Sequence, residues 1–330
     1  MLILTKAVLA MMIGLLTSAG FGLFIIPILK KMNLGQRVSI YVEDFHSKKN
    51  GTPTMGGLIF ILPTLITTLI FILMGKIDMS INLLIVLLVF VGYALIGFLD
   101  DYLSLKNKRN LGFTEIQKLF FQIIVALIFF FLFMKSGSEP ILWIYSLGIK
   151  INMGWLYGVF ILFVLVGTSN AVNLTDGLDG LAGGLSAIAF IAMGIITLGT
   201  GWLEGFQDIG MFSFILTGSL FGFLIFNSHP AKVFMGDTGS LSLGATLAAI
   251  AILTRHELTL IIVGGVFVIE TLTAIIQIVS VKLFNKKVFL MTPIHHTFEK
   301  LGWAETDIVK LFWVIGLTLA MAALAFGVWI

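Results

Sequence analysis

Long apolar segments separated by short polar loops constrain this chain more than any other feature of its sequence. A helix needs about 20 apolar residues to cross a bilayer, and ten runs approach or exceed that length. Only 11% of the residues are charged, against about 25% in a typical soluble domain. We therefore predict an all-α, polytopic membrane protein that forms a single domain over residues 1–330. The ten expected helices cover 4–29, 53–74, 81–99, 117–135, 154–172, 181–199, 209–227, 241–254, 258–284 and 307–329.

The distribution of lysine and arginine predicts the orientation of these spans. Loops near 30–52, 100–118, 171–180, 228–240 and 285–306, with their flanks, hold 15 of the 20 basic residues. Because basic loops stay in the cytoplasm, we place these loops inside the cell and both termini outside it. The first run lacks a small-residue cleavage motif, so we expect a retained span rather than a signal peptide. The basic residues expected outside are Lys6, Lys76, Lys135, Lys150 and Arg255.

Five aspartates stand where apolar runs end, and this topology places all of them on the cytoplasmic face. Carboxylates are costly near hydrocarbon, about 2.5–3.5 kcal/mol each at a helix centre, so such a gathering predicts a bound cation. The chain has no cysteine, which restricts metal ligands to Asp, Glu, His and water. We expect an enzyme or an ion-handling protein rather than a passive scaffold. The five residues are Asp100, Asp101, Asp176, Asp179 and Asp237.

Asp100 and Asp101 end the third expected span, whose carbonyl end points to the cytoplasm. Two carboxylates at that end oppose the helix dipole, and a bound cation would relieve the conflict. The alternative is a solvated helix end that pairs with Lys106, Lys108 or Arg109.

A glycine-rich segment that begins at Asn170 and Asn173 joins the fifth and sixth spans. Asp176 and Asp179 are three residues apart, which predicts that they share one face of a helical turn. Gly177 and its neighbouring glycines let a ligand approach the backbone, and Asn and Asp beside a helix start suit phosphate, ribose or a metal-bound diphosphate. The alternative is a capped tight loop.

Asp237 and Ser240 precede the eighth expected span. Both could cap that helix, but Asp237 is also the kind of hard oxygen ligand that Mg²⁺ uses together with waters and substrate phosphates.

His295 and His296 lie in the basic loop before the last span. Adjacent residues do not share a helix face, which argues against a two-His zinc site and favours contact with a phosphate or sugar. The alternative is a solvated pair.

Lys49 and Thr54 stand in a glycine-rich stretch before the second span, where they could receive an anionic substrate or form a positive-inside flank. Glu270 is the one acid expected deep in a span, with Gln277 on the same face. An ionisable group at that depth usually faces protein or water.

Together these segments resemble the polyprenyl-phosphate N-acetylhexosamine-1-phosphate transferases. Five motifs carry the resemblance, in order and over most of the chain. They are 51–57 (GTPTMGG), 98–102 (FLDDY), 170–184, 234–240 (FMGDTGS) and 293–296 (PIHH).

The resemblance implies a Mg²⁺-dependent reaction at the cytoplasmic face of the bacterial cell membrane. UDP-N-acetylmuramoyl-pentapeptide would donate its phospho-sugar to undecaprenyl phosphate, giving lipid I and UMP for peptidoglycan synthesis. The family also implies a homodimer, and no nucleic-acid partner is expected. The alternative within the family is an N-acetylglucosamine-1-phosphate transferase, which the GTPTMGG form and the histidine loop disfavour.

The resemblance also implies roles for individual residues. Asp100 is the implied base or nucleophile, which leaves one-step and two-step mechanisms open, and Asp237 is the implied metal ligand. Asp101, His295 and His296 would complete the catalytic set, although Thr297 stands where many relatives have a third histidine. The implied substrate-binding residues are Lys49, Thr54, Lys118, Asn170, Asn173, Asp176, Gly177, Asp179, Asn227, Phe234 and Ser240.

A cation transporter is the alternative from another class of protein. Transport needs polar groups near the midplane of the membrane, whereas the acids here gather at one interface and only Glu270 lies deep. Ion flux in proteoliposomes would indicate transport, and UMP release that requires undecaprenyl phosphate would indicate the enzyme.

Overall fold

The computed structural model describes residues 3–31, 51–107, 112–144, 147–199 and 206–329, with side chains up to residue 325. Lys49, Lys108 and Arg109 lie outside these ranges. Helices dominate the described chain. They are α1 (Ile3–Lys31), α3 (Leu58–Leu73), α4 (Ile81–Asn107), α5 (Glu115–Lys135), α6 (Leu156–Thr175), α7 (Leu181–Gly199), α8 (Gln207–Asn227), α9 (Gly236–Leu253), α10 (Glu257–Val263), α11 (Gly265–Phe284), α12 (Ile294–Lys300) and α13 (Glu305–Trp329).

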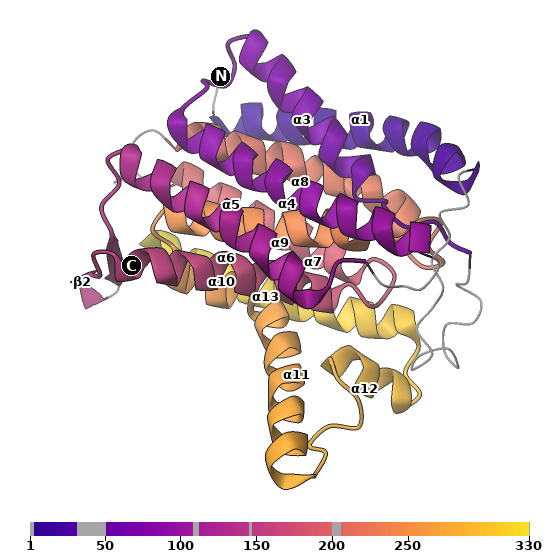
Figure 1. Ribbon diagram of the computed structural model, residues 1–330. Helices are drawn as coiled ribbons and strands as arrows, with labels where there is room; N and C mark the ends of the chain where they lie inside the picture. Colours follow the sequence, from indigo (N-terminus) through magenta and orange to yellow (C-terminus); the bar gives the residue numbers. More distant parts are fainter. Residues whose placement is uncertain (1–2, 32–50, 108–111, 145–146, 200–205, 330) are drawn as a thin grey trace.

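The expectation of a polytopic membrane protein is confirmed. Within the described residues, nine helices are long and apolar enough to cross a bilayer, and α3 is a shorter apolar helix. Most of the long helices lie side by side in one bundle, while α11 leaves it and points away (Figure 1). α1 begins and α13 ends at the same end of the bundle, as ten crossings require (Figure 1). The side of the membrane on which that end lies remains a prediction.

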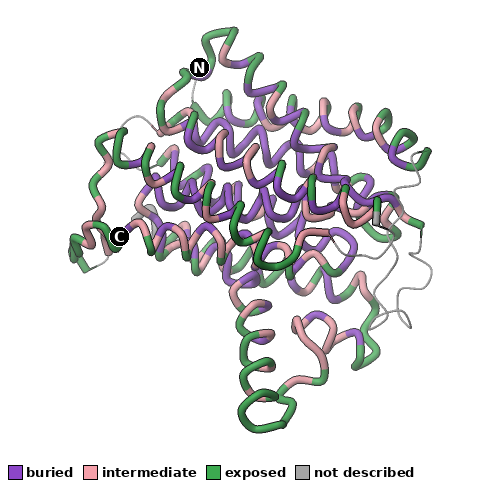
Figure 2. Tube along the Cα trace, viewed as in Figure 1, coloured by how far each residue is buried: buried purple, intermediate pink, exposed green. Residues whose placement is uncertain are grey.

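The centre of the bundle is formed by α8 and α9 (Figure 2). In the membrane-spanning stretch of each helix, 83% of the residues of α8 and 89% of those of α9 are buried, against 28% in α1. Small residues let helices approach closely in membranes, and α1 packs on α8 in this way. A side chain at Gly218 would collide with the backbone of Met11, and one at Gly14 would collide with the carbonyl of Ile215. These contacts allow no residue larger than glycine.

One element was not expected from the hydropathy pattern. A two-stranded antiparallel hairpin joins α5 to α6, with β1 (Ile141–Ile144) paired to β2 (Ile149–Asn152). It lies at the same end of the bundle as the C-terminal end of α13 (Figure 1).

The second expected helix begins later than predicted, at Leu58 rather than residue 53. The amides of Gly56 and Gly57 donate to the carbonyls of Phe234 and Met235 at 2.8 and 2.9 Å. These bonds hold the turn before α3 against the residues that precede α9, and Met55, with φ of +65°, interrupts the helical backbone there.

The prediction of one ninth helix over 258–284 is wrong, because α10 ends at Val263 and α11 starts at Gly265. Glycine pairs are a common cause of sharp kinks, and Gly264 and Gly265 stand at this break. A side chain at Gly265 would also lie 2.7 Å from Leu319 of α13. The break lets α11 turn away from the bundle (Figure 1).

The glycine contact between α1 and α8 gives a first prediction. Gly218→Val should lower stability by about 1–3 kcal/mol, the usual cost of overpacking, because the new side chain meets the backbone of Met11. The melting temperature in detergent, followed by size-exclusion fluorescence, measures this. Gly20→Ala is the matched control, since nothing lies within 4 Å of its added Cβ. Equal melting temperatures for the two variants would contradict the packing described.

Candidate active site

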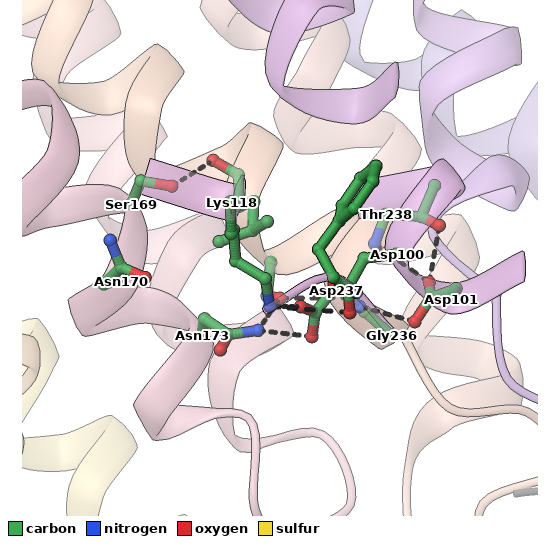
Figure 3. Close-up of polar contacts among 12 residues, drawn as sticks. Asp100, Asp101, Lys118, Ser169, Asn170, Asn173, Gly236, Asp237 and Thr238 are labelled. Atoms are coloured by element: carbon green, nitrogen blue, oxygen red, sulfur yellow. Dashed lines mark hydrogen bonds and ion pairs between the residues drawn. The ribbon is translucent and has the colours of Figure 1, made fainter. Parts of the chain in front are cut away.

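Three charged side chains from three helices meet at the end of the bundle where α4 and α6 terminate (Figure 3). Nζ of Lys118, on α5, lies 2.5 Å from Oδ2 of Asp237 on α9 and 3.4 Å from Oδ2 of Asp100 on α4. The amide of Phe113 also donates to Oδ1 of Asp100 at 2.8 Å. All three charged side chains are only partly exposed, between 12% and 22%. One lysine thus bridges two carboxylates, which leaves the cluster with a net negative charge.

Asn173, on α6, completes the contacts of Asp237. Its Nδ2 donates to Oδ1 of Asp237 at 2.8 Å (Figure 3). The same Nδ2 donates to Oγ of Ser240, also at 2.8 Å. The structure therefore brings together five residues expected from the sequence, which are Asp100, Lys118, Asn173, Asp237 and Ser240.

Asp101 has a different role from its neighbour. Its carboxylate accepts from the amides of Asp237 and Thr238 at 3.2 and 3.0 Å, and from the hydroxyl of Thr238 at 2.6 Å. An anion at a helix N-terminus satisfies unpaired amides and interacts favourably with the dipole. Asp101 therefore caps α9 from a neighbouring helix, and the side chain of Asp237 is left to face Lys118.

Gly236 makes this arrangement possible. It has φ of +72°, which favours glycine, and a Cβ there would lie 2.5 Å from Oδ2 of Asp101 and 2.7 Å from Oγ1 of Thr54. Thr54, a predicted substrate-binding residue, is buried, and its hydroxyl has no hydrogen-bond partner within the described chain.

The dipole argument made for Asp100 and Asp101 is wrong. Helix α4 continues to Asn107, so the two aspartates lie inside the helix rather than at its end. Successive residues of a helix point about 100° apart, and Asp100 accordingly faces α5 while Asp101 faces α9.

The expectation that Asp176 and Asp179 share a helical turn is also wrong. Helix α6 extends to Thr175, so Asn170 and Asn173 lie on the helix, while Asp176 follows its last residue and Asp179 lies in the loop before α7. Asn170 donates to Gln122 at 3.2 Å and lines a cleft of about 240 Å³ with Lys118, between α5 and α6.

Asp179 ties two loops together. Its Oδ2 accepts from the amide of Ala231 at 3.0 Å and lies 3.2 Å from Nδ1 of His229, while its own amide donates to Glu305 at 2.7 Å. Ligand atoms of Asp179, His229 and Glu305 all lie within 4.8 Å of one another. The sequence reading missed His229 and Glu305, because His229 follows a helix end without a metal-binding spacing and Glu305 starts the last helix.

Asn227 and Phe234 hold the same region in place. Asn227 accepts from the amide of Gly180 at 3.1 Å and donates to the carbonyl of Val233 at 3.0 Å. The amide of Phe234 donates to the carbonyl of Pro53 at 2.8 Å. The segments around Asp179, Asn227 and Phe234 therefore contact one another, and Phe234 also joins them to the segment before α3.

The two histidines lie on the short helix α12 and not in an irregular loop as expected. His295 is fully buried and packs against Gly177, where any side chain would collide with its Nε2. The rings of His295 and His296 are 4.1 Å apart. Gly177 thus links the histidines to the α6 end that carries Asn173, and sequence spacing could not show this link.

An apolar helical bundle with an acidic, lysine-bridged cluster at one end defines a multi-pass membrane protein with a candidate active site. The profile described as glycosyl transferase family 4 matches residues 83–255, and a signature of phospho-N-acetylmuramoyl-pentapeptide-transferases matches residues 49–61.

Relatives of that name match over nearly their whole length. The protein from Oceanobacillus iheyensis is 49% identical over 97% of this chain and 96% of its own, and that from Geobacillus thermodenitrificans is 46% identical over 98% of each. The Bacillus subtilis protein is 44% identical over 97% of each. The chain belongs to the phospho-N-acetylmuramoyl-pentapeptide-transferase family, and it is a transferase of the bacterial cell membrane.

The different roles of Asp100 and Asp101 give a second prediction. Asp101→Ala should lower stability by about 0.5–2 kcal/mol, the usual cost of a lost helix cap. Asp100→Ala should cost less, because the loss of one backbone hydrogen bond and of the 3.4 Å ion pair with Lys118 is offset by removal of the repulsion between Asp100 and Asp237. Melting temperatures of the two variants test this, and a larger loss for Asp100→Ala would show that Asp101 does not hold α9.

Proposed function

We propose that the chain transfers phospho-N-acetylmuramoyl-pentapeptide from its UDP-linked donor to undecaprenyl phosphate, giving lipid I and UMP at the cytoplasmic face. The observation that carries this proposal is the convergence of Asp100, Lys118 and Asp237 from three helices at one end of an apolar bundle. The names of the relatives support the donor and the product. A homodimer, which the family resemblance implies, belongs to the same proposal.

The acidic cluster fits Mg²⁺, which takes one or two carboxylates together with waters and substrate phosphates. Asp237 would hold the ion, with Asp100 beside it, since both offer hard oxygen atoms toward the same point. When bound, Mg²⁺ supplies charge neutralisation for the diphosphate and its leaving group. The Asp179, His229 and Glu305 group fits less well, because it includes a ring nitrogen whereas Mg²⁺ prefers oxygen ligands.

Lys118 and Asp100 have complementary roles in the proposed reaction. Two phosphate-bearing substrates repel each other, and the ammonium group of Lys118 offsets part of that charge. In the one-step route, Asp100 takes the proton of the lipid phosphate, whose oxygen attacks the sugar-linked phosphorus as the bond to UMP breaks. In the two-step route, the Asp100 carboxylate attacks the same phosphorus, UMP leaves and an acyl phosphate forms, and the lipid phosphate then attacks this phosphorus and releases Asp100. Both routes place Asp100 beside the transferred phosphorus.

The loops around Gly177, Asp179, Asn227 and Phe234 would receive the uridine diphosphate. These loops border one another through the hydrogen bonds of Asp179 and Asn227, and they adjoin the α6 end that carries Asn173. Thr54, Asp176 and the undescribed Lys49 complete this proposed set.

An apolar groove supports a lipid carrier as the second substrate. It has a volume of about 330 Å³ and runs between α6 and the α10–α11 pair, with Phe160, Phe163, Leu272 and Ile275 among its lining residues. A groove of this composition on the lipid side of a bundle suits an isoprenoid chain.

The transporter alternative has weaker support. Glu270, the acid expected at depth, lies 3.1 Å from His295 of α12 and so belongs to the region of the histidine helix. The remaining expected acids gather at the bundle end.

The metal-ligand role of Asp237 gives a third prediction. Asp237→Asn should reduce Mg²⁺-dependent UMP release by roughly 10²–10³-fold, the usual range for loss of one strong electrostatic group. The control is Asp307→Asn, an exposed acid on α13 that contacts only Lys310 at 3.4 Å among the interactions described for it. Full activity of a folded Asp237→Asn variant would remove Asp237 from the site.

The donor gives a fourth prediction. Purified protein in detergent with undecaprenyl phosphate should release UMP from UDP-N-acetylmuramoyl-pentapeptide and show at least about tenfold lower kcat/KM with UDP-N-acetylglucosamine. The reverse preference would place the chain with the N-acetylglucosamine-1-phosphate transferases. Donor turnover without the lipid acceptor would count against the transfer.

A further inference from the structure

A buried acid–imidazole pair joins α11 to α12. Glu270 and His295 are both 0% exposed, and Nδ1 of His295 lies 3.1 Å from Oε2 of Glu270. The angle at this contact falls outside hydrogen-bond geometry, and no other described residue bonds either side chain. Buried polar groups without partners are costly, so a small rotation that completes an N–H···O bond between the two is strongly favoured.

The opposite edge of the His295 ring faces the loop after α6, which contains Gly177. A side chain at Gly177 would collide with Nε2 of His295, so the imidazole lies directly against that backbone. The ring therefore has Glu270 at Nδ1 and the loop after α6 at Nε2.

His296 repeats this orientation with a different acid. Its Nδ1 lies 2.6 Å from Oε2 of Glu299, one turn along α12. In both histidines a carboxylate lies beside Nδ1. A carboxylate at one ring nitrogen favours the tautomer with the proton on that nitrogen, and it fixes the orientation of the ring.

The connection between α11 and α12 is held independently of this pair. Gln277 accepts from the amides of Val288 and Phe289 at 2.9 and 3.0 Å, and Thr297 donates to the carbonyl of Met291 at 2.5 Å. Thr297 thus closes the loop before α12. Loss of the Glu270 carboxylate would leave these bonds in place.

We propose that Glu270 is a positioning residue: its carboxylate keeps a proton on Nδ1 of His295 and so fixes Nε2 as the nitrogen held against the backbone of Gly177, in the loop that would receive the donor's diphosphate. The second half of this statement rests on the proposed function, whereas the tautomer of His295 does not. Glu270 acts through the imidazole and touches no substrate.

Nitrogen-15 histidine NMR of the full chain in lipid nanodiscs tests the tautomer. The chain has five histidines, and the signal lost in His295→Gln identifies His295. We expect a protonated Nδ1 in the native protein and a changed signal in Glu270→Gln, with the His296 signal preserved. Glu299→Gln is the matched control and should change His296 instead. An unchanged His295 signal in Glu270→Gln would overturn the proposal.

A double-mutant cycle on UMP release tests the coupling. Glu270→Gln should lower kcat by about 10–100-fold, the usual effect of losing an orienting partner, with a smaller change in KM. In the His295→Gln background the same substitution should change kcat less than about twofold, because the two act as one unit. If the fold-reductions in kcat of Glu270→Gln and His295→Gln multiply in the double variant, Glu270 acts independently of His295. That result would overturn the proposal.

Two further measurements separate the causes of failure. Thr273→Val, one turn from Glu270, removes a hydroxyl that bonds only the helix backbone and should keep native kcat. If the native protein releases no UMP, the proposed function is wrong. The NMR experiment still tests the tautomer of His295, because it does not depend on turnover.

Discussion

The contact between the Asp101 carboxylate and the first amides of α9 is the constraint on which the site depends. Three donors converge on this buried carboxylate, and the positive end of the helix dipole adds to the attraction. Because α9 starts where Asp101 holds it, Asp237 one residue into the helix is presented to Lys118 and Asn173. Asp100 precedes Asp101 on the same helix, so one rigid element places both carboxylates of the cluster.

The cluster also shows how charge is kept at the edge of an apolar bundle. Two carboxylates share one ammonium group, and an amide and a backbone N–H supply further partners. This leaves a net negative site with hard oxygen atoms, the kind of site that the proposed Mg²⁺ ion would require to bind together with substrate phosphates. The same groups that make the charges tolerable in the folded protein are thus the ones suited to phosphoryl transfer.

The five aspartates look equivalent in the sequence, yet their roles differ. Asp100 and Asp237 face the lysine, Asp101 caps a helix, Asp179 ties two loops, and Asp176 follows the last residue of α6. Their position at one end of the bundle could be predicted, since it follows from the number of spans between them and from the lysine and arginine content of the loops. Their separate roles could not, because each depends on which backbone amide or lysine from a distant segment lies within hydrogen-bond distance.

The class of fold and the approximate positions of most spans could be predicted from the sequence alone, because about 20 apolar residues in a row have few alternatives in lipid. Packing in the folded bundle determines where α3 and α9 begin, where the ninth run breaks, and that the histidines lie on a helix beside Gly177 and Glu270. Those outcomes depend on contacts between residues far apart in the chain, such as the amides of Gly56 and Gly57 on the carbonyls before α9. Local propensity and hydropathy contain no information on such contacts.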